Sequence, residues 1–128
     1  MDCVFCEIIA GKKDCFKIYE DENVLAFLDI NPVVEGHTLV MPKRHVERLE
    51  DLSDEEAVFV LRAIKRVVKL LLKKLQADGY NVVVNAGRIA GQEILHLHFH
   101  VFPRKSGDGG LFTPKEIDLE RVYRKIMD

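Results

Sequence analysis

Apolar residues recur every three or four positions between Ser53 and Gly79. The stripe comprises Val58, Leu61, Ile64, Val67, Val68, Leu71 and Leu75, and this period is typical of a helix with one face in a core. Ser53 and Glu56 are spaced as in a capping box, in which each side chain satisfies a free backbone N–H at the helix start. The pattern predicts one long helix that begins after Ser53 and ends at Gly79, where glycine permits a left-handed stop. A coiled-coil seam is the alternative, although only about three heptads are available.

Five other segments are rich in branched and aromatic residues, which are typical of strands. They are residues 16–19, 24–30, 38–41, 80–85 and 95–102, and the first two are spaced as a hairpin. A capping box at Thr113 and Glu116, with Pro114 at the first helical position, predicts a last helix over about residues 114–127. The expected fold is therefore α+β, with an antiparallel sheet, one long helix and shorter helices.

Length and charge limit the kind of protein this can be. The chain has 128 residues, 48% of them hydrophobic and 31% charged, which suits a single domain over residues 1–128 with a core at about residues 3–104. A net charge of −2 provides no global positive field, so we expect no nucleic-acid partner. The acidic start of the chain and the lack of an apolar run of about 20 residues argue against a secretion signal or a membrane span. We therefore expect a cytoplasmic protein without a membrane partner.

Three of the five histidines alternate with apolar residues in the last predicted strand. Because strand side chains point alternately to two faces, His96, His98 and His100 are expected on one face, with neighbouring rings roughly 6.6 Å apart. Clustered imidazoles cost packing energy unless they are solvated, paired, metal-bound or catalytic. At this spacing one ring can attack a phosphorus while the next contacts its oxygens, or two rings can share a metal ion. The pattern alone leaves both chemistries open.

The loop before these histidines runs Asn-Ala-Gly-Arg-Ile-Ala-Gly-Gln over residues 85–92. Two glycines, an amide at each end and the cation Arg88 suit close approach of the backbone to an anion. The glycine spacing matches neither a P-loop nor a dinucleotide-binding fingerprint. Taken alone, the loop is an ordinary turn with a weak indication of phosphate binding.

Residues 91–102, Gly-Gln-Glu-Ile-Leu-His-Leu-His-Phe-His-Val-Phe, resemble the signature of the histidine triad (HIT) family, and Pro103-Arg104 follows as in many members. Residues 19–21, 26–32, 36–45 and 85–87 resemble further blocks of that family in the expected order, so the resemblance covers about residues 3–104. It implies a HIT-like α+β fold in a homodimer, with a purine nucleotide bound beside the triad.

The resemblance also implies roles for single residues. By position, His98 matches the nucleophile that attacks the α-phosphorus and forms a covalent nucleotidyl-histidine. Imidazole suits this role because it is substantially neutral near pH 7. His100 and Asn85 match residues that contact phosphate oxygens, and the backbone carbonyl of His96 would orient the nucleophilic ring. Gln92 matches a polar residue near the scissile bond.

The nucleotide pocket implied by the resemblance includes a carboxylate, Asp29, that accepts hydrogen bonds from ribose hydroxyls. A carboxylate in an otherwise apolar strand belongs at the strand end or beside a partner. The remaining implied positions are Phe5, Ile8, Phe27, Leu28, Ile30, Gly91, Glu93 and Ile94, and the apolar ones among them are equally well explained as core. Glu93 departs from the family pattern, since well-studied members carry a Ser or Thr there that is thought to assist the leaving group. An acid at this position would repel a polyphosphate chain or donate a proton, which leaves the leaving-group preference open.

Cys3 and Cys6 have the two-residue gap that lets a pair of thiolates bind one zinc ion, but they supply only half of a tetrahedral shell. A zinc-bearing subset of the wider family completes such a site at positions that correspond to His45 and His96. The resemblance therefore implies one zinc ion per chain, with a structural role because four protein ligands leave no open position for water. A cysteine pair without metal is the alternative.

The function implied by the resemblance is a nucleotide-binding hydrolase that acts on the α-phosphate of purine nucleoside phosphoramidates. Alternatives with the same chemistry are a dinucleoside polyphosphate hydrolase and a nucleotidyl transferase. Two alternatives come from other classes: a catalytic metal centre held by the triad through His98, and a non-catalytic nucleotide sensor or interaction module.

Overall fold

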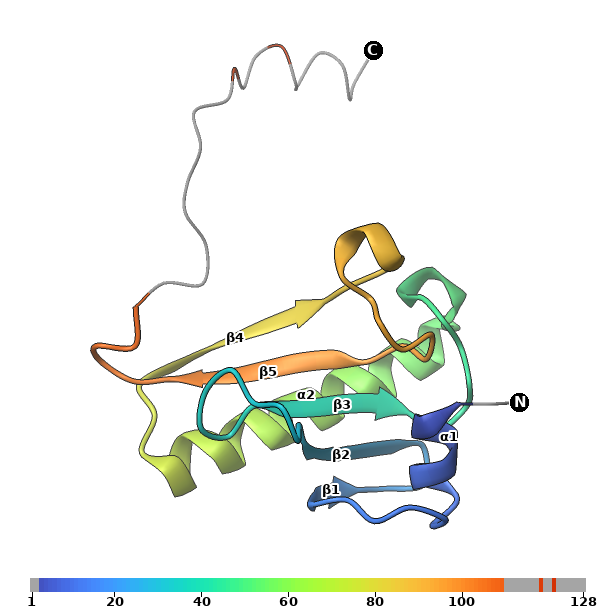
Figure 1. The fold of residues 1–128 in the computed structure, drawn as a ribbon, viewed down its shortest axis with the longest axis horizontal. Coiled ribbons are helices and arrows are strands. Elements are labelled where there is room, and N and C mark those ends of the chain that lie inside the picture. Colours follow the sequence, from blue (N-terminus) through green and yellow to red (C-terminus); the bar gives the residue numbers. More distant parts are fainter. Residues whose placement is uncertain (1–2, 110–117, 119–120, 122–128) are drawn as a thin grey trace.

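The structure, a computed structural model, describes residues 3–109, 118 and 121. Its centre is a five-stranded sheet with the strand order β1-β2-β3-β5-β4, in which all neighbours are antiparallel (Figure 1). The elements are α1 (Val4–Ile9), β1 (Lys17–Glu20), β2 (Val24–Leu28), β3 (Thr38–Pro42), η1 (Leu49–Asp51), α2 (Asp54–Leu75), β4 (Gly79–Val84), η2 (Arg88–Ala90) and β5 (Phe99–Arg104). The predicted α+β fold with one long helix is confirmed, whereas the helix predicted over about residues 114–127 lies outside the described residues.

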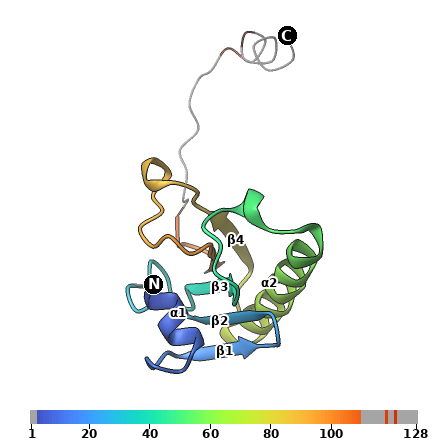
Figure 2. The same cartoon turned by 90° about the vertical axis from the view of Figure 1, so that its right-hand side faces the viewer.

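The two helices α1 and α2 cover opposite faces of the sheet (Figure 2). Side-chain alternation along β2 supplies both cores: Val24 and Ala26 are buried with α2, and Leu25 and Phe27 are buried with α1. Every residue of this strand from Val24 to Phe27 is therefore buried. The α1 face is the one that holds the chemistry described below.

Helix α2 begins at the predicted capping box. Ser53 Oγ accepts the Glu56 N–H at 3.1 Å, and a Glu56 carboxylate oxygen accepts the Ser53 N–H at 2.9 Å. The predicted end at Gly79 is wrong: the helix stops at Gln76, which takes the left-handed conformation with φ of 54°, and Gly79 begins β4. Gln76 thus has the left-handed conformation at the helix end that was predicted for Gly79.

The buried face of α2 is rotated from the predicted stripe. The residues buried in the core are Val60, Ala63, Ile64, Val67, Val68 and Leu71. Val58 and Leu61 were expected in that stripe, yet they are 54% and 61% exposed. The small Ala63, which is not part of the predicted stripe, is fully buried in the core. Within the described residues, we find no helix with the length and apolar character that crossing a bilayer requires.

The last predicted strand begins later than expected. Strand β5 starts at Phe99, so His96 and His98 lie in the segment that leads into it. In that segment the chain bends at residues 94–96, and the Leu97 N–H donates to the Val46 carbonyl at 2.7 Å. His96 lies against Cys3 and Cys6, and the His98 and His100 rings lie side by side with centroids 5.0 Å apart.

Gly36, in the turn before β3, leads to a prediction about stability. Its φ is +86°, and a Cβ added there would lie 2.4 Å from Leu75 Cδ1 and 3.0 Å from Pro103 Cγ. We expect Gly36→Ala to lower the free energy of unfolding by roughly 2–4 kcal/mol in urea titrations, through backbone strain and overpacking together. Gly11→Ala is the matched control, because Gly11 also has a positive φ but nothing lies within 4 Å. An equal loss in both variants would show that packing against α2 has no part in the effect.

Candidate active site

A pocket of about 590 Å³ lies between α1, the end of β2 and the loop that precedes β5. One end is apolar, and there the rings of Phe5 and Phe27 pack edge to face with centroids 5.7 Å apart. The other end is lined by His98, His100 and Asn85. The volume is in the range that holds a drug-sized ligand, and the pocket joins an apolar surface to a cluster of polar nitrogens.

The His98 ring is held in one orientation and one tautomer. Its Nδ1 lies 2.7 Å from the His96 carbonyl oxygen, and because a carbonyl only accepts, Nδ1 carries the proton. The lone pair is therefore on Nε2. Phe5 packs edge to face against the ring at 5.1 Å. Burial lowers the pKa of His98, while the His96 carbonyl and the charge of Asp29 oppose the shift, so the ring is neutral near pH 7.

A chain of hydrogen bonds sets the tautomer of His100. The Val33 N–H donates to His37 Nδ1 at 3.1 Å, which leaves the proton of a neutral His37 on Nε2. That Nε2–H faces His100 Nδ1 at 2.9 Å and, more distantly, the carboxylate of Asp29 at 3.5 Å. When His37 donates to His100, the proton of a neutral His100 is on Nε2. His100, a pocket-lining residue, thus offers an N–H donor rather than a second lone pair.

Asp29 directly follows Leu28, the last residue of β2. The carboxylate therefore lies at the end of the apolar strand, which is one of the two positions predicted for it. Its Oδ1 accepts the Asn31 N–H at 2.8 Å, and its backbone N–H donates to the His37 carbonyl at 2.9 Å. The side chain is 19% exposed and lines the pocket. Its second oxygen, Oδ2, faces His37, so the carboxylate is fixed by the chain and still reaches the pocket.

Gln92 lies outside the pocket. Its Oε1 accepts the Gly87 N–H at 2.8 Å, and its Nε2 donates to the carbonyls of Glu47 and Ile94 at 2.8 and 3.1 Å. With 2% exposure and its amide groups occupied by backbone, Gln92 joins the loop over residues 85–92 to the segment after β3. Gln92 therefore supports the loop whose residues Asn85 and Gly91 line the pocket.

A metal-binding geometry lies beside the pocket, where Cys3, Cys6, His45 and His96 bring one ligand atom each to within 4.8 Å of one another. The Sγ to Nδ1 distances are 3.5 Å for Cys3 and His96, 3.3 Å for Cys6 and His45, and 3.6 Å for Cys6 and His96. Zinc–sulfur and zinc–nitrogen bonds at tetrahedral angles place such atoms about 3.6 Å apart. These four residues therefore fit a tetrahedral metal ion.

The tautomer of His96 supports the same conclusion. Its Nε2–H donates to the Pro42 carbonyl at 2.8 Å, which leaves the Nδ1 lone pair directed at the two sulfur atoms. A second hydrogen bond of this kind is what orients a metal-ligating histidine. Among the described residues, Asp29, His37 and His100 form the other group close enough to share a metal ion, but their contacts are already explained by hydrogen bonds. His98 belongs to neither group.

The model of the HIT domain family matches the chain over residues 10–107, which is most of its length. The chain belongs to the HIT family. The resemblance noted in the sequence is thus confirmed.

Relatives of this HIT protein agree with it over nearly the whole chain. An uncharacterised HIT-like protein of Methanocaldococcus jannaschii is 50% identical over 127 residues, which cover 97% of this chain and 98% of the relative. An adenosine 5′-monophosphoramidase of Schizosaccharomyces pombe is 42% identical over 136 residues, with coverage of 98% and 99%. The structure of a zinc-bound histidine triad family protein from Mycobacterium smegmatis superposes with a TM-score of 0.81 at 41% identity, covering 97% of this chain and 89% of that one.

The residues predicted for the site of this HIT protein come together in two adjoining places. Of the positions predicted for the nucleotide, all except Gln92 line the pocket, and the four predicted metal ligands form the cluster. Their roles remain predictions. His37, which orients His100, was not among the residues predicted for the site. The pairing of β3 with β5 brings it there, and the only earlier signal was its place in the block at residues 36–45.

Burial has a consequence for how the stability of this HIT protein depends on pH. It lowers the pKa of His100 to about 4, and the neighbouring His98 and His37 rings add to the shift while Asp29 opposes it. The pKa of His37 is lowered as well, chiefly by burial. In the unfolded chain these rings titrate near 6.5. Between pH 6.5 and 4 the unfolded state therefore binds more protons than the folded state, and stability falls as the pH falls.

We predict that His100→Asn makes this pH dependence shallower. Each histidine that stays neutral only in the fold contributes a slope of up to about 1.4 kcal/mol per pH unit. The measurement is the free energy of unfolding at pH 7, 6, 5 and 4.5 for both proteins. Glu20 and Glu56, whose pKa values are lowered to about 2 by hydrogen bonds from Lys17 and Arg44, act mainly below that window. Identical slopes in the two proteins would mean that His100 gains a proton as readily in the fold as in the unfolded chain.

Proposed function

We propose that this HIT protein binds a purine nucleotide and hydrolyses nucleoside phosphoramidates at the α-phosphate. The observation that carries the proposal is the His98 ring, which lines a pocket of about 590 Å³ with Nδ1–H committed to the His96 carbonyl at 2.7 Å. Nε2 is therefore unprotonated, oriented and free to attack. The S. pombe relative named as an adenosine 5′-monophosphoramidase, 42% identical, supports the choice of a phosphoramidate.

The reaction proceeds in two displacements. In the first, the Nε2 lone pair of His98 bonds to the α-phosphorus, the bond from phosphorus to the leaving amine breaks, and the amine keeps that electron pair and takes a proton from solvent. In the second, a water oxygen bonds to phosphorus, the bond to Nε2 breaks, and the water proton passes to solvent as the nucleoside monophosphate leaves. The covalent intermediate replaces one difficult step with two easier ones.

Neutral donors stabilise the charge that develops on the phosphoryl oxygens. His100 offers Nε2–H because its Nδ1 faces the proton of His37 at 2.9 Å, and the amide of Asn85 lines the same end of the pocket. The His96 carbonyl accepts the Nδ1–H of His98 and stabilises the positive charge that the ring gains when it attacks. Donors that are fixed before the reaction cost no reorganisation when charge appears.

The rest of the pocket suits a nucleoside. Phe5 and Phe27, with Ile30 at the pocket edge, provide an apolar surface for the flat base, and such a surface contributes through aromatic packing and burial. The Asp29 carboxylate accepts hydrogen bonds from the ribose hydroxyls. We therefore expect base, sugar and α-phosphate to lie in order along the pocket, from α1 toward His98.

The test is incubation with adenosine 5′-phosphoramidate, followed by mass spectrometry of intact protein quenched during turnover. We expect AMP release and a nucleotidyl adduct on the wild type, and neither with His98→Ala. Faster turnover of diadenosine polyphosphates than of the phosphoramidate would favour the alternative of a dinucleoside polyphosphate hydrolase. AMP release by folded His98→Ala at the wild-type rate would refute the proposed nucleophile.

We propose in addition that the cysteine–histidine cluster holds a structural zinc ion. Cys3, Cys6, His45 and His96 would complete a tetrahedral shell with no open position, so the ion would brace the chain rather than activate water. The fit of the sulfur and nitrogen atoms to that geometry supports this role, as does the zinc-bound relative from M. smegmatis.

A homodimer is the expected assembly of this protein. Among the described residues, strand β4 lies at the edge of the sheet with β5 as its one neighbour, and Tyr80 and Val82 on it are 50% and 40% exposed. An exposed edge of this kind favours pairing with a second copy. We expect light scattering on the protein as it leaves a size-exclusion column to give twice the mass of one chain. A mass of one chain at micromolar concentration would contradict the dimer.

A further inference from the structure

A second pocket adjoins the first and shares a wall with it. Its volume is about 460 Å³, and the two pockets have Val4, Glu93 and Ile94 in common. Among the described residues, Glu93 is the one charged side chain that lines both. It is exposed in the loop that precedes β5 and lines the same pocket as His98 and His100.

The charges that line the first pocket are mostly negative. Three carboxylates, Asp14, Asp29 and Glu93, face one ammonium, Lys13. Lys13 is itself paired with Glu7 at 3.3 Å, so its charge is already balanced. The described charged residues that line this pocket therefore sum to a net negative charge.

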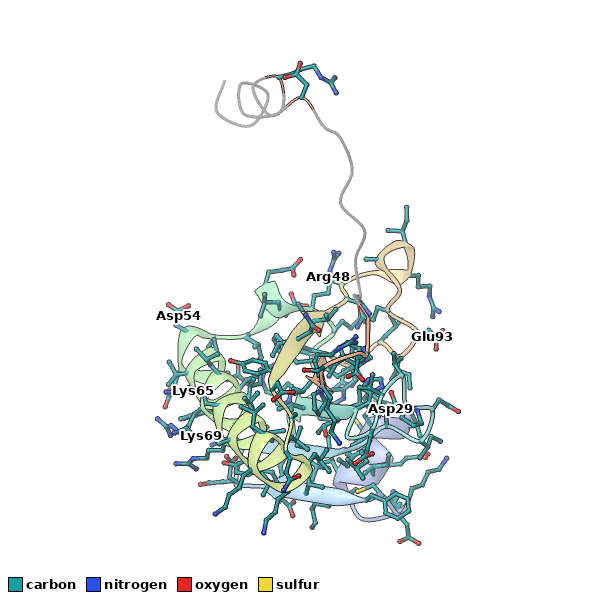
Figure 3. All side chains as sticks on the ribbon, turned by 90° about the vertical axis from the view of Figure 1, so that its left-hand side faces the viewer. Asp29, Arg48, Asp54, Lys65, Lys69 and Glu93 are labelled. Atoms are coloured by element: carbon teal, nitrogen blue, oxygen red, sulfur yellow. The ribbon has the colours of Figure 1, made fainter. Side chains whose placement is uncertain are left out.

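The second pocket has the same bias. Glu47 and Glu93 line it together with a single cation, Arg88. Figure 3 shows Asp29 and Glu93 on one side of the molecule and Lys65 and Lys69 of α2 on the opposite side. The described charges that line the two pockets that share Glu93 are thus net negative in each.

The groups that would hold the phosphate carry no charge at neutral pH. The pKa of His100 is lowered to about 4, mainly by burial, and Asn85 offers only an amide. A site built in this way binds one phosphoryl group through neutral donors and has no positive charge for further phosphates. The electrostatic field of the pocket therefore acts chiefly on the part of the substrate beyond the phosphorus.

We propose that Glu93 makes this enzyme select nucleoside phosphoramidates whose leaving amine carries a second, positively charged group. This inference rests on the proposed function and specifies its substrate class. An ammonium on the leaving group is attracted by Glu93 and Glu47, whereas a carboxylate or a pyrophosphate is repelled. Glu93 is a specificity-determining residue in this scheme, and His98 performs the chemistry.

The test compares three adenosine 5′-phosphoramidates that differ only in the leaving amine: ethylenediamine, ethanolamine and β-alanine. Their free ends are cationic, neutral and anionic. We expect the ratio of kcat/KM for the ethylenediamine substrate to that for the ethanolamine substrate to fall about three- to tenfold in Glu93→Gln, the size of one charge interaction across solvent-exposed distances. The β-alanine substrate should gain relative to ethanolamine in the same variant. In the wild type, 1 M NaCl should move both ratios toward those of Glu93→Gln.

Asp54→Asn is the matched control, because it removes the same charge from the start of α2, well away from Glu93 (Figure 3). Its ratios are expected to equal those of the wild type. If Glu93→Gln and wild type give ratios within a factor of two of each other while all three substrates release AMP, the inference about Glu93 is wrong and the proposed function stands. If folded wild type releases AMP from none of them, both fail.

Discussion

Replacing His98 by Asn is expected to lower the rate of AMP release from adenosine 5′-phosphoramidate at least about a thousandfold, because the variant lacks the side chain proposed to form the covalent bond. Asparagine keeps a hydrogen-bond donor near the His96 carbonyl, which the His98 ring engages at 2.7 Å, so the local backbone need not move. The measurement is single-turnover AMP release with enzyme in excess, which separates the chemical step from product release.

The same variant should still fold and bind. We expect its thermal unfolding midpoint to stay within a few degrees of the wild type, and its Kd for AMP to change less than about tenfold, since Phe5, Phe27 and Asp29 remain in place. A loss of turnover accompanied by loss of AMP binding would point to a damaged pocket instead. Retention of more than a tenth of the wild-type rate would show that another group attacks the phosphorus.

The double substitution Cys3→Ser and Cys6→Ser is expected to abolish metal binding and to lower the thermal unfolding midpoint by at least about 10 °C. The cluster joins α1, the segment after β3 and the segment before β5, and metal binding that depends on folding contributes directly to the folding free energy. Elemental analysis should find about one zinc ion per wild-type chain and none in the variant.

Cys15→Ser is the control, since Cys15 is the third cysteine and lies outside the cluster. It should keep the zinc content and the unfolding midpoint of the wild type. Full zinc content in the double variant would eliminate this site. Loss of zinc without loss of stability would mean that the packing of the three segments holds them together without the ion.

Local signals in the sequence predicted the long helix well at one end only. The capping box at Ser53 is a short-range pattern, and its two hydrogen bonds are present. The stop at Gln76 could not be predicted, because a non-glycine residue in the left-handed region is held there by surrounding structure. The six-residue α1 was missed for a similar reason: it is too short for helical periodicity to show, and its position is fixed by contacts of Cys3 and Phe5 with distant residues.

The candidate site shows the same division between local pattern and long-range contact. Alternation of three histidines identified the segment that lines the pocket and the cysteine–histidine cluster, but alternation could not show that the strand begins only at Phe99, after the Leu97 N–H has bonded to the Val46 carbonyl. Nor could alternation show that His96 faces the cysteines while His98 lines the pocket. The contact between His37 and His100 spans 63 positions, and only the sheet register brings these two rings together.

Phe5 lies between the cysteine–histidine cluster and the pocket. In the sequence it lies between the proposed metal ligands Cys3 and Cys6, and its ring touches both His96 and His98, with centroids 6.0 and 5.1 Å away. The cluster and the pocket therefore share one aromatic side chain. By thermodynamic reciprocity, whatever factor the proposed ion adds to nucleotide affinity, the nucleotide must add to retention of the ion.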